Sequence, residues 1–385
     1  MRSQAFVLLS VLGLVAAAPG CLSGTNGVPS AQGGDAGGVS GDDPTKNPND
    51  ADVIQYRDLS SHPGCTTAGL SYTPANIPGF PCAAKEYLPA MEDTSKPIVL
   101  LVHGNSDSPA EFEVCHPGSD PVTSGCVDPS KSPPMLAERL VAAGFHAFAV
   151  DLRPDKSDDP TCQMGPTCNA AKNMDHAWGV PIVQSFVEAV MNAYPNREIS
   201  MLGFSYGPGV IRDALRRLHR DGKKPFEHIR DLVFVSGGNH GVSTYQQLCQ
   251  NEQDPANTSM AGRCACEMGN RTGYMATPFH APLNGPNGAY ETPCSDGSHA
   301  FGQTGVCGGH TVRYTTLVMK DISQGTYQDE FVSQSAAMLM GADNETDELT
   351  DQDETGYFYN GAFKNHFGSV RSEAALTKIM SWFSR

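Results

Sequence analysis

Residues 198–218 read EISMLGFSYGPGVIRDALRRL, and this stretch decides the fold. The first part, 198–204, is largely apolar and predicts a strand, whereas apolar residues at 210, 211, 214, 215 and 218 have the spacing of an amphipathic helix. Between them lies Gly203-Phe-Ser205-Tyr-Gly207, the only Gly-x-Ser-x-Gly in the chain. This pattern is typical of a nucleophilic serine on a sharp, strained strand-to-helix turn. Ser205 is therefore the predicted nucleophile, and a purely structural turn is the alternative.

Strand-like and helix-like segments alternate on both sides of this turn. A continuous apolar run, typical of a parallel strand covered on both faces, predicts a strand at 97–103, and further strands are predicted at 145–152, 231–235 and 313–319. Helical periodicity predicts helices at 135–143, 180–194 and 373–383. This alternation predicts an α/β fold, in which helices cover both faces of a doubly wound, mostly parallel sheet.

The segment after the strand at 97–103 reads His103-Gly104-Asn105 and is expected to complete the site. Two backbone N–H groups commonly hold the negative charge that develops on a substrate carbonyl oxygen. One belongs to the residue after the nucleophile, here Tyr206, at the N-terminus of the following helix. We expect the other to belong to Asn105, with Gly104 allowing the sharp turn. His103 is expected to be structural and to hydrogen-bond this loop.

One histidine is well placed to act as the general base. Seven histidines follow Ser205, and six of them precede the strand predicted at 313–319: 219, 228, 240, 280, 299 and 310. Only His366 follows that strand, and it lies directly before the C-terminal helix. Serine hydrolases with this kind of turn carry their residues in the order serine, acid, histidine. We therefore predict His366 as the base, and a loop histidine is the alternative.

The acid that orients the base should lie between the last strand and His366. Candidates are Asp321, Asp329, Glu330 and the acidic run at 343–354. Asp329 opens Asp-Glu-Phe-Val, an acid followed by an apolar anchor, and is preferred over Asp321, which lies close to the strand end. The acidic run is most simply a solvated loop, with a calcium site as the alternative.

Four pieces of the chain carry a resemblance to a known family. They are Val99-Leu-Leu-Val-His-Gly, Ile199-Ser-Met-Leu-Gly-Phe-Ser-Tyr-Gly, Leu283-Asn-Gly with Glu291-Thr-Pro before Tyr314-Thr-Thr-Leu, and Asp329-Glu-Phe-Val followed by His366-Phe-Gly. With these pieces the sequence resembles the bacterial class 2 triacylglycerol lipases, which are small secreted α/β-hydrolases. It is more distantly similar to extracellular polyhydroxyalkanoate depolymerases.

The resemblance implies an α/β-hydrolase fold and ester hydrolysis, and it supports Asp329, because the family's acid lies in an equivalent Asp-x-x-Val. The sequence departs from the family pattern at Phe204, where His is common, at Pro208, and in Cys-rich loops at 105–134 and 249–307. These loops line the expected substrate entrance. The family's mechanism is therefore expected to transfer more safely than its substrate.

Residues 243–311 break the strand–helix alternation. This interval is rich in Gly, Pro, Asn and Cys and has no clear period, and such a long loop inside a compact domain is usually functional. We predict a cap-like insertion, pinned by disulfides, over one end of the sheet. The chain has 12 Cys, and pairs such as 65–82, 115–126 and 162–168 are plausible, although the sequence leaves the connectivity open. Cys264-Ala-Cys266 is too tight for a zinc ribbon, so no metal is expected.

The N-terminal residues 1–20 resemble an export signal, with Arg2 before a short apolar stretch and small residues at the end. Cys21 follows directly, as in the lipidation site of bacterial lipoproteins, although Ala18 stands where Leu is usual. An ordinary cleaved signal with an incidental Cys is the alternative. Large apolar residues are almost absent up to residue 50, which predicts a flexible tether at 21–50 before a catalytic domain at 51–385. We expect a lipoprotein on the outer membrane or cell surface, or a secreted protein.

The composition limits the kinds of partner that the protein is expected to bind. The 42 acidic and 26 basic residues give a formal net charge of −16, which disfavours nucleic acid as a partner. We expect a monomer that needs no cofactor, contacts the membrane only through Cys21 and acts on an apolar ester or lipid. The predicted function is an exported serine carboxylic ester hydrolase, a lipase or esterase, that forms an acyl-enzyme with Ser205. The alternatives are a polyester depolymerase and a catalytically idle surface lipoprotein.

Overall fold

The computed structural model describes residues 73–77, 80–104, 109–115, 134–152, 179–241, 281–284, 306–307, 310–320, 329, 331–339, 341–348 and 364–385. All the described residues belong to one compact unit within Asp43–Arg385. The predicted export signal, Cys21 and the tether lie outside the described residues.

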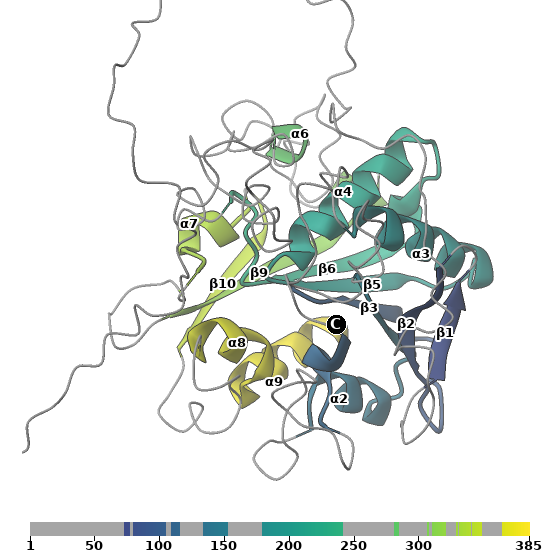
Figure 1. Cartoon of the computed structure of the whole chain (residues 1–385), viewed down its shortest axis with the longest axis horizontal. Coiled ribbons are helices and arrows are strands. Elements are labelled where there is room, and N and C mark those ends of the chain that lie inside the picture. The colour runs from purple at the N-terminus through teal and green to yellow at the C-terminus, as the bar shows by residue number, and fades with distance from the viewer. Residues whose placement is uncertain are drawn as a thin grey trace, which may run out of the picture. The chain divides into compact units, whose positions relative to one another are not determined.

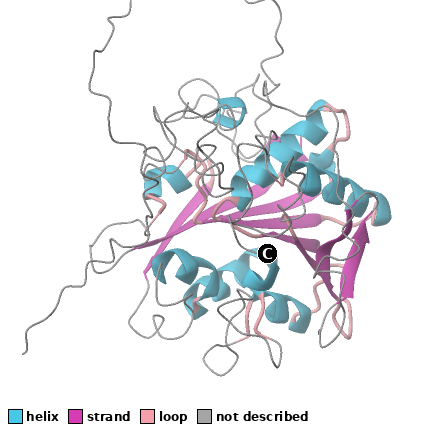
Figure 2. Cartoon of the chain, in the orientation of Figure 1, coloured by secondary structure: helices cyan, strands magenta, loops and turns pink. Residues whose placement is uncertain are grey.

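An eight-stranded sheet forms the centre of this unit, with the strand order β1-β2-β4-β3-β5-β6-β9-β10 (Figure 2). The strands are β1 (Thr73–Ile77), β2 (Phe80–Tyr87), β3 (Ile98–Val102), β4 (Ala147–Val150), β5 (Ile199–Phe204), β6 (Ile229–Val235), β9 (Arg313–Lys320) and β10 (Asp343–Glu348). β2 is antiparallel to both β1 and β4, and every other pair in the sheet is parallel. The predicted α/β fold with a mostly parallel sheet is confirmed.

Helices cover both faces of the sheet (Figure 1). On one face, α3 (Val180–Ala193) packs against α4 (Gly207–Arg220). On the other lie α2 (Leu136–Ala142), α8 (Lys364–Arg371) and α9 (Glu373–Phe383). Among the helices that the structure describes, none combines the length and the hydrophobicity needed to cross a bilayer.

The central strands supply side chains to two separate cores because successive residues of a strand point to opposite faces. Leu100 of β3 belongs to the core under α3 and α4, whereas its neighbour Leu101 belongs to the core under α2 and α9. Every residue of β3 and β5 is buried. This burial on both faces explains why β3 is a continuous apolar run and why β5 is mostly apolar.

The shorter elements lie in the connections. They are the single-turn helices η2 (Pro109–Phe112), η4 (Pro225–Glu227), α6 (Ala281–Asn284) and α7 (Gln334–Ala337), and a two-stranded sheet of β7 (Val306–Cys307) and β8 (His310–Thr311). Only α6, β7 and β8 represent the predicted insertion at 243–311, whose remainder lies outside the described residues. Cys115 is disulfide-bonded. The cysteines proposed to pin the insertion are not among the described side chains.

The structure differs from the sequence prediction in three segments. The run at 343–354 was expected to be a solvated loop, but residues 343–348 form β10, which pairs in parallel with β9, so that expectation is wrong. The hairpin of β1 and β2 was not predicted. No helix was predicted directly before the C-terminal helix, but His366 lies in the separate helix α8.

The acidic strand β10 forms because its backbone pairs with β9 and one polar side chain is fully engaged. The Asn344 carboxamide accepts hydrogen bonds from Thr316 Oγ1 at 2.6 Å and Leu339 N at 3.0 Å, and donates to the carbonyl oxygen of Leu339 at 2.9 Å. Charged residues are common on edge strands, where they prevent pairing with another chain. The acidic pattern of 343–348 is therefore compatible with a strand at the sheet edge.

Candidate active site

Ser205 lies on the turn between β5 and α4, at the carboxyl end of the central strands. Its φ of 58° is in the left-handed region, which a serine rarely adopts. Its N–H donates to the Val235 carbonyl at 2.9 Å, and its carbonyl accepts from Gly238 N at 3.2 Å. The strained serine is thus held by backbone hydrogen bonds on both sides. The strain that the sequence predicted is confirmed.

The glycines beside the serine are required by close packing. A Cβ on Gly203 would lie 2.6 Å from Pro208 N, and a Cβ on Gly207 would lie 2.5 Å from the Val102 carbonyl oxygen. Both distances are shorter than any real Cβ contact, so larger residues would force the strand and helix apart. Pro208 occupies the first turn of α4, where a backbone N–H would have no intrahelical partner.

The structure brings Ser205, His366 and Asp329 into one hydrogen-bonded chain. His366 Nδ1 lies 2.8 Å from Asp329 Oδ2, and His366 Nε2 lies 2.9 Å from Ser205 Oγ. Since an ionised carboxylate can only accept, Nδ1 carries the proton. Nε2 is then the acceptor for the Ser205 hydroxyl, which is the arrangement that a general base requires.

Asp329 is itself held in place by the backbone that follows it. Its Oδ1 accepts from Phe331 N at 2.7 Å and from Val332 N at 2.6 Å, which leaves Oδ2 to face the imidazole. Asp329 is 6% exposed and His366 4% exposed. The two backbone donors compensate the buried carboxylate and fix its orientation.

Aromatic rings hold the imidazole on two sides. The Phe204 ring centroid lies 4.9 Å from that of His366 and the Phe331 centroid 5.0 Å from it, the latter with a nearly perpendicular plane. Neither ring was predicted to contact the base. In the sequence, Phe204 differs from the pattern of the family that the chain resembles, whereas only its place after Asp329 distinguishes Phe331.

The segment after β3 lies beside the serine. A Cβ on Gly104 would lie 2.9 Å from Ser205 Cβ, so only glycine fits there without displacing the serine. His103 Nδ1 lies 2.8 Å from the Gly104 carbonyl oxygen, and Leu152 N donates to His103 Nε2 at 3.0 Å. Nε2 is therefore an acceptor, and Nδ1–H is the donor to Gly104. His103 thus hydrogen-bonds the loop, as expected from the sequence.

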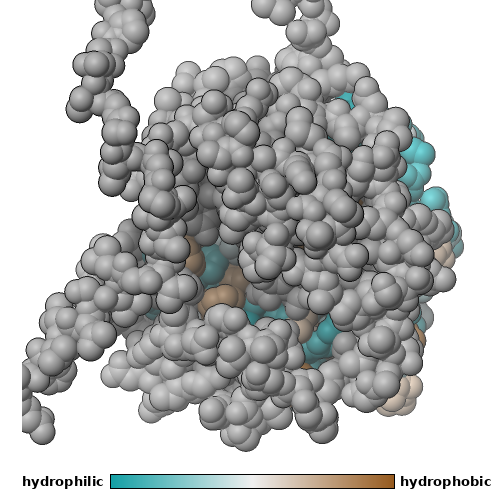
Figure 3. All heavy atoms as spheres, in the orientation of Figure 1, coloured by the Kyte–Doolittle hydropathy of each residue, from teal (hydrophilic) through white to brown (hydrophobic). Residues whose placement is uncertain are grey.

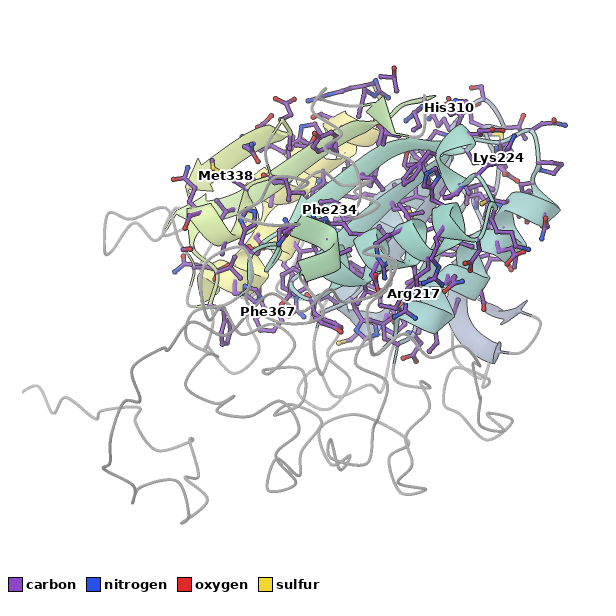
Figure 4. All side chains as sticks on the ribbon, turned by 90° about the horizontal axis from the view of Figure 1, so that it is seen from above. Arg217, Lys224, Phe234, His310, Met338 and Phe367 are labelled. Carbon is purple, nitrogen blue, oxygen red and sulfur yellow. The ribbon has the colours of Figure 1, made fainter. Side chains whose placement is uncertain are left out.

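The other predicted site residues are placed only in part. Tyr206 is buried and caps the N-terminus of α4 directly after Ser205. Asn105, Asp321 and Glu330 lie outside the described residues. Figure 4 shows Phe367, next to His366, far from Lys224 and His310, which lie together at the opposite ends of the strands. In Figure 3, hydrophobic and hydrophilic side chains of described residues are seen side by side near the middle of the view.

Neither a protein-family model nor a curated protein matches the sequence. Among solved structures, the chain is similar to the mature lipase BlEst2 of Bacillus licheniformis, with 15% identity and a TM-score of 0.45 over 78% of this chain and 97% of that one. The similarity to lipase B of Aspergillus fumigatus has 14% identity and a TM-score of 0.41, and it covers 79% of this chain and 56% of that one. The similarity to esterase RhEst1 from Rhodococcus sp. ECU1013 has 15% identity and a TM-score of 0.36, and it covers 82% of this chain and 99% of that one.

Similarities this low carry no argument about activity. The observed strand order, the mostly parallel sheet and the strained serine between β5 and α4 fit the α/β-hydrolase fold. The resemblance to class 2 lipases and to polyhydroxyalkanoate depolymerases stays a prediction from the sequence.

Proposed function

We propose that this protein is an exported serine hydrolase of the lipase or esterase type, which cleaves carboxylic esters through a covalent acyl-enzyme. The observation that carries the proposal is the hydrogen-bonded chain from Ser205 Oγ through His366 to Asp329, built on a strained strand-to-helix turn. A nucleophile within reach of a base, with that base oriented by a carboxylate, is the arrangement of acyl-transfer enzymes.

In the first half-reaction, Ser205 Oγ attacks the ester carbonyl carbon while its proton moves to His366 Nε2. The charged imidazolium is stabilised by Asp329, which stays ionised and holds the Nδ1–H tautomer. The tetrahedral intermediate then collapses. The bond to the alcohol oxygen breaks, His366 gives its proton to that oxygen, and the acyl group remains on Ser205.

The negative charge on the carbonyl oxygen needs donors that are already in place. We assign this role to the N–H groups of Tyr206 and Asn105. Tyr206 stands at the N-terminus of α4, where the backbone N–H groups have no intrahelical acceptor and the helix dipole favours an anion. The hydrogen bond from His103 fixes the Gly104 carbonyl. The N–H of Asn105 belongs to the same planar peptide group, so its proposed role as a donor requires this carbonyl to be held in place.

In the second half-reaction, His366 takes a proton from water, and the resulting hydroxide oxygen attacks the acyl carbon. Collapse returns the proton to Ser205 Oγ and releases the carboxylic acid. These steps need only the side chains and backbone groups named above. An ester makes the smaller demand on the site, because a peptide would also need a groove that pairs with its backbone.

A fluorophosphonate probe tests the proposed nucleophile. We expect one adduct per chain, mapped by mass spectrometry to Ser205, and no adduct in Ser205→Ala. His366→Ala should fold but react far more slowly, because the hydroxyl then lacks its base. Absence of labelling in the folded wild-type protein would favour a catalytically idle surface protein.

We also propose that the mature protein is attached to the outer membrane or the cell surface through a lipid on Cys21. Support comes from the sequence, in which Cys21 follows a short apolar segment and precedes a stretch that is poor in large apolar residues. Such a stretch would hold the catalytic domain away from the membrane.

A further inference from the structure

A buried ion pair connects the segment after β3 with the helix that carries His366. Arg371 Nε donates to Glu111 Oε1 and a terminal guanidinium nitrogen donates to Glu111 Oε2, both at 2.7 Å. The Arg371 side chain is 3% exposed and that of Glu111 is fully buried. The two residues are 260 positions apart in the chain, so their contact is created by the fold alone.

The two residues of this pair lie on two different segments that each carry a part of the candidate site. Glu111 lies in η2, which packs against β3 and β4 and follows the same connection as Gly104, the residue in contact with Ser205. Arg371 lies in the last turn of α8, whose first turn holds His366. The pair therefore joins the segment that follows Gly104, beside the nucleophile, to the helix that carries the base.

Stability alone does not account for such a pair. Removing two charges from water costs about as much as their attraction returns, and apolar side chains of similar size often serve as well or better. A two-bond contact between a guanidinium and a carboxylate does, however, fix orientation as well as distance. Unlike an apolar contact, this pair fixes how η2 and α8 are placed relative to each other.

A second contact connects Arg371 to the aromatic rings around the imidazole. The guanidinium of Arg371 lies over the Phe367 ring, 4.6 Å from its centroid. The Phe367 centroid lies 5.9 Å from that of Phe204, which in turn packs against His366. Arg371 thus fixes the helix that carries the base and also supports the rings around it.

We propose that Glu111 and Arg371 are positioning residues that set the distance and orientation of the His366 imidazole relative to Ser205. The proposal rests on the proposed roles of Ser205 and His366. It requires that loosening the pair lowers turnover while leaving the fold and substrate binding nearly intact, because small displacements of reacting groups are costly in rate.

The test compares Arg371→Lys, which keeps the charge but loses the two-bond contact, with Arg139→Lys. Arg139 forms a similar two-bond contact with Glu373, more exposed, between α2 and α9 on the same face of the sheet. We expect Arg371→Lys to lower kcat for a nitrophenyl ester by roughly 10- to 100-fold, with KM changed by less than about threefold. Arg139→Lys should leave both constants nearly unchanged.

A double variant, Glu111→Leu with Arg371→Met, guards against a loss of folding. Replacing both charges by apolar side chains should preserve the unfolding temperature but still lower kcat as the single variant does. If either variant folds and keeps the wild-type kcat, the pair has no positioning role. If kcat falls only where the unfolding temperature falls with it, the role is structural and the proposal is wrong.

The proton shared by His366 and Asp329 gives a readout that does not depend on ester turnover. Its low-field NMR signal, assigned by its loss in His366→Ala, should broaden or shift in Arg371→Lys and stay in place in Arg139→Lys. An unchanged signal in Arg371→Lys would overturn the proposal. If the wild-type protein hydrolyses no ester and takes no fluorophosphonate, the proposed function fails, whereas this signal still decides whether the pair positions the imidazole.

Discussion

Asp329 contacts His366 with one carboxylate oxygen and the following backbone with the other. In Asp329→Asn the amide group can donate to Nδ1, which favours the tautomer that carries its proton on Nε2. That imidazole cannot accept the Ser205 proton, so we expect kcat for ester hydrolysis to fall by roughly a thousandfold or more. Asp321→Asn, the matched control from the same connection, should change kcat little. The reverse ranking would assign the acid to Asp321.

At the scale of single residues, local patterns were enough to predict Ser205, His366 and Asp329. The Gly-x-Ser-x-Gly pattern and the order serine, acid, histidine are properties of the chain itself. The aromatic contacts of His366 and the pair of Glu111 and Arg371 could not be predicted. Each depends on which segments the sheet order brings together, and no local pattern marks an arginine that will meet a glutamate 260 positions away.

At the scale of elements, Glu138 in the first turn of α2 gives a test by pH. Its carboxylate accepts from Val114 N at 3.2 Å and Met135 N at 3.1 Å, so it ties the segment after η2 to the start of the helix. Burial raises the pKa of Glu138 to about 7 from an ordinary value of 4.5, and the charge of Glu113 nearby adds to this. The folded state therefore holds a proton here that the unfolded state loses at lower pH.

Because the pKa is raised on folding, the contribution is fully present below about pH 4.5 and is lost as the pH rises through about 7. The loss amounts to at most roughly 3 kcal/mol. We expect Glu138→Gln to flatten this decline in the free energy of unfolding, measured by urea titration at several pH values. A variant with the same pH dependence as the wild type would show that Glu138 does not carry the effect.

Elements were predictable where their pattern was strong. The strand β3 is apolar throughout and β5 is so except for Ser200, because both faces of these strands are buried, and α3 and α4 show clear helical stripes. β10 was missed because its strand state comes from pairing with β9 and from the hydrogen bonds of Asn344, whereas its own residues are mostly acidic. α8 was missed because it is short and its sequence, KNHFGSVR, contains a glycine.

At the scale of the whole molecule, α6, which lies within the insertion predicted at 243–311, is held to the domain by hydrogen bonds. The buried Arg212 of α4 donates to the Leu283 carbonyl at 3.0 Å and to Asn284 Oδ1 at 2.8 Å, both in α6. Asn284 Nδ2 also donates to the Asn239 carbonyl at 2.8 Å, in the turn after β6. This network fixes one point of the insertion close to the candidate site.

A cap at 243–311, as predicted from the sequence and held at Leu283 and Asn284, should favour short and medium acyl chains and give little activation at an oil–water interface. A chain-length series of nitrophenyl esters, run beside emulsified triglyceride and amorphous polyhydroxybutyrate, measures this directly. A rate that rises steadily with long acyl chains, or jumps on emulsified substrate, would show that the insertion opens. Activity confined to the polyester would indicate a depolymerase, and hydrolysis of peptides alone would reject ester hydrolysis.

The lipid anchor is a separate prediction at the same scale. We expect the mature protein to begin at Cys21, to carry lipid there and to fractionate with membranes. Mass spectrometry of the mature N-terminus decides this, and Cys21→Ser, which cannot form the lipid thioether, should release active enzyme. An unmodified terminus in the wild-type protein would contradict the anchor without affecting the account of the site.

Trapping of the acyl-enzyme tests directly whether Ser205 is the nucleophile of ester hydrolysis. Rapid mixing with a nitrophenyl ester and acid quenching within the first turnover should give one acyl group per chain, located on Ser205 by peptide mapping, together with a burst of nitrophenol. Ser205→Ala should show neither, at an almost unchanged unfolding temperature, and retain less than about a thousandth of the rate. Ester hydrolysis that continues in Ser205→Ala, or an acyl group found on another residue, would contradict the account.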